Sequence, residues 1–314
     1  MTETLDTGAP ITLNATPLPR QSILIVNAMS RSGAKAFDEV RHKLIAAGIE
    51  LIAARAIDDP NEMEPAVRDA IARAPMVIIG GGDGSLSSNV DFFVGHDTVF
   101  AVVPLGTANS FAGTLGIPKG VDSAIDVIAN GTRKRIDLGR INDDYFVNAA
   151  AIGLSPMIAE TVPHNLKRYL GKLGYFIWAL RCAVKFLPFS MTIENDDGRR
   201  ERLWATEVRI ANGTHHGGIE LVESQELDSG DIVVQAVTGK SILRLAWSWL
   251  ATILKLRARH GTTREFRGKS MKLSTRPRLR ISIDGEIAAK TPVTVCVARG
   301  AIEIAAPRDG QFQT

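Results

Sequence analysis

Short apolar runs alternate with amphipathic segments from residue 22 to about residue 131. The apolar runs predict buried strands, and they occupy 22–27, 49–55, 76–79 and 98–106. The segments between them have helical periodicity and end at glycine or asparagine signals; they occupy 33–48, 61–74 and 121–131. This alternation is typical of a parallel, Rossmann-like α/β sheet, in which ligands bind outside the carboxyl ends of the strands.

The pattern changes after residue 136, where strand-like stretches dominate. They occupy 145–149, 189–194, 204–211, 232–237, 279–283 and 293–298. Asp-Gly turn signals at 197–198 and 284–285 separate several of them. We therefore expect an antiparallel β-sandwich, interrupted by two helical stretches at 164–187 and 241–260.

These patterns divide the chain into two domains with short tails. We expect a flexible tail at 1–20, an α/β domain at 21–136, a β-sandwich domain at 137–307 and a C-terminal tail at 308–314. The first twenty residues lack the basic and apolar regions of a signal peptide. No run of about 18 apolar residues predicts a membrane span. Two cysteines without metal spacing favour a reducing, cytoplasmic setting.

The charge is distributed unevenly between the two halves. Residues 1–160 carry 13 Lys and Arg against 19 Asp and Glu, whereas residues 161–314 carry 24 against 15. Ten basic residues and one Glu fall within 255–280, and Trp247 and Trp249 lie just before them. A basic run of this kind is a solvated surface, an anionic-membrane contact or a nucleic-acid contact. The neighbouring tryptophans favour the membrane, with a helix packed on the β domain as the alternative.

The sequence GGDGSL at 81–86 directly follows the strand predicted at 76–79. Glycines at a strand end let the backbone turn sharply, and free N–H groups in such a turn bind anions, so phosphate is the expected guest. A plain strand-to-helix turn is the alternative. Neither the dinucleotide fingerprint nor the P-loop pattern fits, because Ser85 and Ser87 replace glycines and no Lys follows.

Two further strand ends should meet this loop on one rim of the sheet, at 27–33 and 104–113. A phosphate-binding rim facing a second domain suggests phosphoryl transfer, which needs charge neutralisation and a base. The candidate carboxylates are Asp83, Asp137, Asp284 and Glu286. The triplet at 284–286 is also what an ordinary hairpin turn would contain.

The GGDGSL block followed by PLGTANSFAG at 104–113 resembles the diacylglycerol kinase catalytic-domain family. That family includes bacterial soluble lipid kinases, sphingosine kinases and ceramide kinases. Blocks at 165–181, 211–230 and 281–307 resemble family segments in the same order, so the similarity covers about 22–307. The resemblance implies ATP- and Mg²⁺-dependent phosphorylation of a lipid hydroxyl in a cleft between the two domains.

The resemblance also implies roles for individual residues. Glu286 would be the general base, supported by Asp284, and Asp83 and Asp137 would face Mg²⁺. The residues implied in ATP binding are Asn27, Ser30, Gly33, Gly81, Gly82, Asp83, Gly84, Ser85, Thr107 and Asn109.

The chain departs from the family pattern at several positions. Ser85 stands where Thr is usual, Ser87 and Ser88 where Asn-Glu is frequent, and Ser110 where many members have Asp. Ser110 weakens the implied carboxylate network around the metal. Ser229 replaces an Asp of a structural Mg²⁺ site that some bacterial members have.

Diacylglycerol, converted to phosphatidic acid, is the first choice of acceptor, with ceramide or a sphingoid base as the alternative. A kinase acting on NAD and a non-catalytic lipid sensor are more distant alternatives. We expect a cytoplasmic protein that contacts the inner face of the membrane through 241–280 and binds no nucleic acid. The sequence leaves open whether the protein forms a homodimer.

Overall fold

The structure is a computed structural model, and the residues it describes are 16–29, 33–161, 163, 178, 181–182, 186–212, 215–216, 219–220, 229–241, 247, 262–308 and 311–312. Ser30, the tail at 1–15 and most of the helical stretches expected at 164–187 and 241–260 lie outside these residues. Among the described residues, no helix has the length and apolar character needed to cross a membrane.

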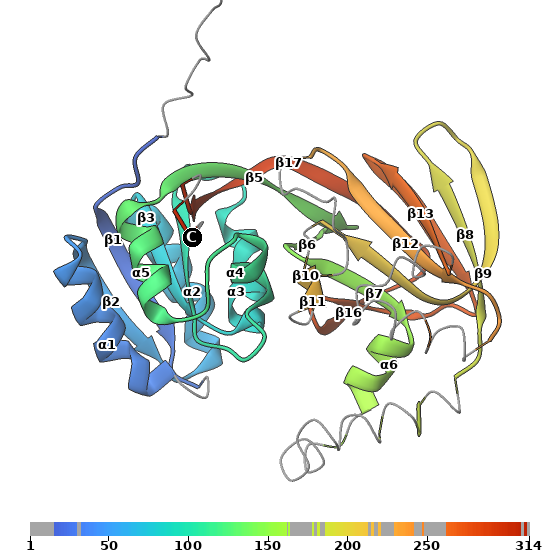
Figure 1. Ribbon diagram of the computed structural model, residues 1–314, viewed down its shortest axis with the longest axis horizontal. Helices are drawn as coiled ribbons and strands as arrows, with labels where there is room; N and C mark the ends of the chain where they lie inside the picture. Colours follow the sequence, from blue (N-terminus) through green and yellow to red (C-terminus); the bar gives the residue numbers. More distant parts are fainter. Residues whose placement is uncertain are drawn as a thin grey trace, which may run out of the picture.

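The N-terminal domain is a parallel sheet with helices on both faces (Figure 1). Its strands are β1 (Gln21–Asn27), β2 (Glu50–Ile57), β3 (Met76–Gly81) and β4 (Val99–Pro104). Its helices are α1 (Gly33–Ala46), α2 (Pro60–Arg73), α3 (Asp83–Val90), α4 (Ser110–Thr114) and α5 (Val121–Asn130), with a 3₁₀ turn at Asp91–Phe93. The strand order is β2-β1-β3-β4, and every residue of β3 and β4 is buried. Burial on both faces explains why these strands read as unbroken apolar runs.

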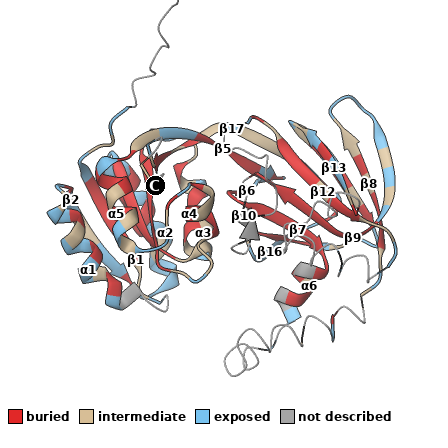
Figure 2. Cartoon of the chain, in the orientation of Figure 1, coloured by how far each residue is buried: buried red, intermediate tan, exposed pale blue. Residues whose placement is uncertain are grey.

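The C-terminal domain is a sandwich of antiparallel strands. Its elements are β5 (Thr132–Ile141), β6 (Asp144–Phe146), β7 (Ala149–Gly153), α6 (Leu154–Thr161), β8 (Phe189–Asn195), β9 (Arg200–Ala211), β10 (His215–His216), β11 (Ile219–Glu220), β12 (Ile232–Thr238), β13 (Thr263–Gly268), β14 (Ser270–Arg276), β15 (Arg280–Ile283), β16 (Glu286–Lys290) and β17 (Val293–Ala306). The long strand β9 pairs with β8 over its first half and with β7 and β12 over its second half. Side chains from both layers form one apolar core, shown in red in Figure 2.

The predicted fold class, a parallel α/β domain followed by an antiparallel β domain, is confirmed. The strand expected at 145–149 is instead two short strands, β6 and β7, with Val147 and Asn148 between them. Residues 263–276 of the basic run form the consecutive strands β13 and β14; in β14 the exposed Lys272 and Arg276 alternate with the buried Met271, Leu273 and Thr275. This alternation was hidden by the density of charge in the sequence.

Two long strands join the domains. β5 and β17 are paired along most of their length and arch from one domain to the other (Figure 1). The end of β17 also pairs in parallel with β4, so the last strand of the chain completes the N-terminal sheet. Asp137, buried within β5, accepts hydrogen bonds from the backbone N–H groups of Gly230 and Gly300, each at 2.7 Å. This carboxylate therefore braces the arch.

A second connection runs through Asp284, in the turn between β15 and β16. Its carboxylate accepts hydrogen bonds from three consecutive backbone N–H groups, those of Val147 (2.9 Å), Asn148 (3.2 Å) and Ala149 (3.1 Å). It also accepts one from the hydroxyl of Ser87 in α3, at 2.5 Å. A carboxylate of the second domain is thus bonded to a helix of the first.

A third connection places a carboxylate in an unfavourable setting. Burial, with a smaller contribution from the nearby charges of Asp144 and Asp284, raises the pKa of Asp91 to about 6, although a hydrogen bond from the backbone N–H of Tyr145 opposes the shift. Ionised Asp91 therefore opposes the contact between α3 and β6.

We expect Ser87→Ala to lower the free energy of unfolding by about 1.5 to 3 kcal/mol, because it removes a hydrogen bond to a partly buried carboxylate. Chemical denaturation measures the loss. Ser88→Ala is the matched control, because Ser88 is the exposed neighbour on the same helix. Equal stability of the two variants would contradict the assigned bond.

We expect Asp91→Asn to stabilise the protein at pH 7.5 and to have little effect near pH 4. The folded-state pKa of about 6 lies above the ordinary value of 3.8, so the wild type loses stability as the pH rises between these values. Melting temperatures of both proteins across pH 4 to 8 measure the difference, which should grow with pH. The exposed Asp143, changed to Asn, is the control. A difference that is constant with pH would contradict the assignment.

Candidate active site

The predicted phosphate-binding loop lies at the point where the strand order of the sheet reverses. β1 pairs with β2 on one side and with β3 on the other, so the ends of β1 and β3 form a topological switch point. The side-chain amide of Asn27, at the end of β1, donates to the Ser85 hydroxyl at 2.7 Å. This bond ties the loop after β3 to the neighbouring strand end.

Glycines in this region permit contacts that side chains would block. A Cβ on Gly106, in the loop after β4, would lie 2.7 Å from the Cα of Gly82. A Cβ on Gly81 would lie equally close to the Cβ of Ser85. The 81–86 and 104–113 loops therefore touch through their backbones, which fits their predicted place on one rim.

Asp83 holds the second loop in place. Its carboxylate accepts a hydrogen bond from the backbone N–H of Phe111 at 3.1 Å, at the start of α4. Desolvation and the charge of Asp284 raise the pKa of Asp83, whereas bonds from the backbone N–H groups of Phe111, Ser110 and Asn109 lower it. The Asp within the glycines therefore connects the two loops.

A pocket of about 310 Å³ opens beside the loop, between the two domains. It is lined by Asn27, Ile57, Asp59, Pro60, Met63, Gly84, Ser85, Ser88, Asn89 and Glu286. Glu286 comes from the C-terminal domain, at the start of β16, and its Oε1 lies 4.0 Å from the position a Cβ on Gly84 would take. The structure thus brings the predicted base to the predicted phosphate loop.

The remaining predicted residues do not line this pocket, and they lie in several different elements. Asn109 closes the 104–113 loop by bonding both polar groups of Gly106, and Thr107 is exposed in the same loop. Gly33 begins α1. Asp284 lies two residues before Glu286, in the junction. Asp137 lies in the arch, where its carboxylate bonds to Gly230 and Gly300 rather than to Asp83.

The ionisable groups that interact at this rim are carboxylates, so its charge is negative. The pKa values of Asp83 and Asp91 are both raised, and no Lys or Arg is among the groups that shift them. In the described part of the chain, no three His, Cys, Asp or Glu side chains gather as a metal site. Since Mg²⁺ is often held by one or two carboxylates together with nucleotide phosphates, Asp83 fits such an ion, while both oxygens of Asp137 are already occupied.

The sequence interpretation missed one side of the pocket. Ile57 ends β2, and Asp59 caps α2 by accepting a hydrogen bond from the backbone N–H of Asn61 at 2.9 Å. Residues 57–63 follow a parallel strand, so the strand-end rule that found the other loops could have found this one. The bond between Ser87 and Asp284 carried no sequence signal.

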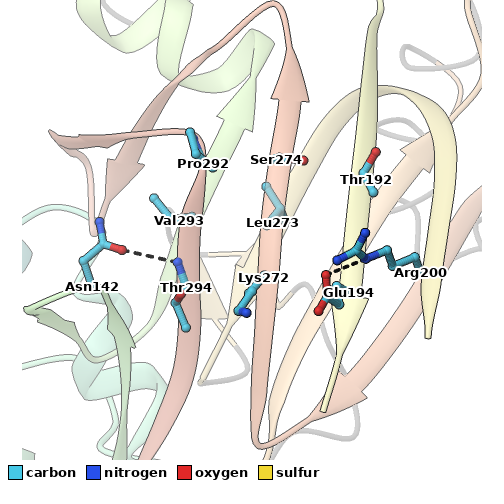
Figure 3. A pocket seen from close by; sticks show the side chains of 10 residues that line it. All are labelled: Asn142, Thr192, Glu194, Arg200, Lys272, Leu273, Ser274, Pro292, Val293 and Thr294. Atoms are coloured by element: carbon cyan, nitrogen blue, oxygen red, sulfur yellow. Dashed lines mark hydrogen bonds and ion pairs between the residues drawn. The ribbon is translucent and has the colours of Figure 1, made fainter. Parts of the chain in front are cut away.

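A second hollow, of about 450 Å³, lies on the outer face of the sandwich (Figure 3). Lys272, Thr192 and Ser274 contribute to its lining, and Glu194 pairs with Arg200 beside them. None of the predicted catalytic or ATP-binding residues lines it, so we place the chemistry in the interdomain pocket.

Known proteins resemble this chain over most of its length. A diacylglycerol kinase of Staphylococcus epidermidis is 26% identical over 236 residues, which cover 74% of this chain and 75% of the relative. A probable YegS-like lipid kinase of Shewanella frigidimarina is 37% identical over 170 residues, covering 52% and 54%.

Solved structures show the same fold. A diacylglycerol kinase from Bacillus anthracis superposes with a TM-score of 0.74 at 19% identity, covering 92% of this chain and 98% of that one. Yeast NADH kinase bound to NADH gives a TM-score of 0.52 at 13% identity, with coverage of 96% and 86%. At these identities the likeness concerns the fold alone.

Family models cover nearly the whole described chain. The diacylglycerol kinase catalytic domain matches residues 21–141, and the YegS C-terminal NAD kinase beta sandwich-like domain matches residues 148–306. The chain belongs to the diacylglycerol kinase catalytic-domain family of lipid kinases.

Proposed function

We propose that this protein transfers the γ-phosphate of ATP to a hydroxyl of a membrane lipid, with diacylglycerol as acceptor and phosphatidic acid as product. The observation that carries the proposal is the position of Glu286. Its carboxylate, from one domain, enters the pocket beside Gly84 of the phosphate loop, from the other. A base facing a phosphate-binding loop is what phosphoryl transfer to an alcohol requires.

The residues of the pocket divide the work as follows. The backbone from Gly81 to Ser85, with Asn27 beside it, holds the phosphates of ATP, while Thr107 and Asn109 border the nucleotide. Ser30 and Gly33, which follow β1 in the sequence, complete the proposed ATP-binding set. Glu286 accepts the proton of the lipid hydroxyl as its oxygen attacks the γ-phosphorus, and ADP leaves. Asp284 does not touch the acceptor; it fixes the hairpin that carries Glu286.

Mg²⁺ is part of this proposal, with Asp83 as the carboxylate that faces it. Bound Mg²⁺ would neutralise charge on the phosphates. Both raised aspartate pKa values at the rim favour a cation there. We expect Asp137 to act on the site only through the arch, since backbone amides occupy both of its oxygens.

Diacylglycerol is favoured by the relatives, which are named diacylglycerol kinases at about one-quarter identity. Ceramide or a sphingoid base remains the alternative, because we expect the acceptor contacts in the β domain, where the sequence signals for the acceptor are weak. A kinase acting on NAD shares the fold, as yeast NADH kinase does. Because the acceptor lies in a bilayer, we also propose that the protein acts in the cytoplasm, at the inner membrane surface.

We expect Glu286→Gln to reduce kcat by at least about a hundredfold, because general-base catalysis contributes on that order. ATP affinity should stay within about twofold, since the amide keeps the shape of the pocket. Turnover assays and ATP titration measure the two quantities separately. Glu265→Gln, in the β domain on β13, is the matched control. Wild-type turnover in Glu286→Gln would remove Glu286 as the base.

The acceptor is tested with labelled ATP, Mg²⁺ and a panel of diacylglycerol, ceramide and sphingosine in mixed micelles, with NAD in solution. We expect label in diacylglycerol, and omission of Mg²⁺ should abolish it. Label only in ceramide or sphingosine would replace the acceptor and keep the mechanism. Label only in NAD, or ATP binding without any labelled product, would contradict the proposed function.

A further inference from the structure

The outer face of the sandwich carries a one-sided charge. Side chains alternate along β8, β9, β14, β17 and β5, so every second residue points away from the core. The basic residues on this outward face are Arg140, Arg200, Arg202, Lys272 and Arg276. Its acidic residue is Glu194, which already pairs with Arg200 at 2.7 Å. The face therefore has a clear excess of positive charge.

The charge surrounds an exposed tryptophan at one end of the face. The Lys240 ammonium lies 4.3 Å from the centre of the Trp204 ring. The Arg202 guanidinium donates to the Ser190 hydroxyl at 2.8 Å, and Ser190 pairs across the strands with Trp204 on one side and Arg276 on the other. With strands about 4.8 Å apart, the backbones of Arg276 and Trp204 are about 10 Å apart. We call Trp204, Lys240, Arg202 and Arg276 the Trp204 cluster.

The cations of the Trp204 cluster are available to an outside partner. Within the described residues, Arg202, Lys240 and Arg276 take part in no ion pair. Trp204 is 44% exposed, and Leu187, which lies just before the Phe189–Ala205 pair, is 80% exposed. An exposed indole beside cations that form no ion pair matches the chemistry of a membrane interface, where tryptophan rings enter the headgroup layer.

The hollow in Figure 3 lies on the same outward face, further along strands β8 and β14 from the Trp204 cluster. Lys272 lines the hollow between Thr294 and Glu194, its partners on the neighbouring strands. Ser274 and Thr192, the next cross-strand pair, add two hydroxyl groups to the lining. Ammonium and hydroxyl donors together suit a phosphate headgroup. The hollow is therefore continuous in charge with the Trp204 cluster.

We propose that this face docks the protein on an anionic phospholipid bilayer, with the Trp204 cluster inserted at the interface. The inference rests on the proposed function, because a kinase whose acceptor is a lipid must bind the membrane that contains that lipid. Trp204 and Arg202 lie on β9 and Lys240 lies just after β12, outside the segment 241–280 to which the sequence assigned the membrane contact; Arg276, on β14, lies within that segment. Nucleic acid is the less fitting partner, because the cluster presents a single exposed aromatic ring and no series of rings on which successive bases could stack.

Sedimentation of the full-length protein with vesicles tests the docking surface. One set of vesicles is phosphatidylcholine alone, and the other contains phosphatidylglycerol. The variants are Arg202→Gln with Arg276→Gln, and Trp204→Ala. The matched control is Arg41→Gln with Arg55→Gln, which removes two exposed charges from the N-terminal domain. Far-ultraviolet circular dichroism and monomeric short-chain diacylglycerol as acceptor report folding and turnover without a membrane.

We expect the wild type to prefer the anionic vesicles and to lose binding as salt is added. Each cation removed should weaken partitioning roughly fivefold, so the double variant should bind about twenty-fivefold more weakly, and the control should bind as the wild type does. Trp204→Ala should weaken binding at every salt concentration.

Equal vesicle binding by the wild type and the folded cluster variants would overturn this inference, even if the short-chain acceptor is phosphorylated. Binding of RNA in preference to anionic vesicles would overturn it as well. Vesicle binding that depends on the cluster, with no acceptor phosphorylated, would support the docking surface while contradicting the proposed function.

Discussion

The arrangement of the site depends on the carboxylate of Asp284. Three consecutive backbone N–H groups at 147–149 and the hydroxyl of Ser87 converge on its two oxygens. A partly buried carboxylate is stable only where donors surround it, so the turn after β15, the segment before β7 and helix α3 must meet there. Glu286 follows two residues later on the same hairpin. The contact that satisfies one carboxylate therefore positions the other at the phosphate loop.

Negative and positive side chains gather in different parts of the molecule. Carboxylates of both domains collect at the rim, where Asp83 and Asp91 resist ionisation because they are desolvated and near other acids. The opposite sign gathers on the outer strands of the sandwich. A rim of carboxylates receives a highly anionic nucleotide only with cations, whereas a positive outer face attracts an anionic surface without them.

Local patterns were sufficient to predict most of the strands and the contact between the 81–86 and 104–113 loops, because apolar periodicity and glycine signals act over a few residues. They could not predict partners distant in the chain. Asp83 was expected at a metal, yet its carboxylate also holds the start of α4, and Asp137 was expected beside it but bonds to Gly230 and Gly300. The strands β13 and β14 were hidden for the same reason, since their partners β12, β8 and β17 lie far along the sequence.

The departure from the family pattern at Ser110 has a physical account in this charge balance. Ser110 is buried, and its backbone N–H is among the groups that lower the pKa of Asp83. An Asp at this position, as the resemblance would lead one to expect, would place another desolvated carboxylate beside one whose pKa is already raised by burial and by Asp284. Serine keeps the backbone donor and a polar side chain without adding that charge. Ser87, which stands where Asn is frequent, keeps a polar side chain and donates its hydroxyl to Asp284. The serine at 110 thus reduces the negative charge that a cation at the rim would have to balance, and the bond from Ser87 helps to hold the hairpin that positions Glu286.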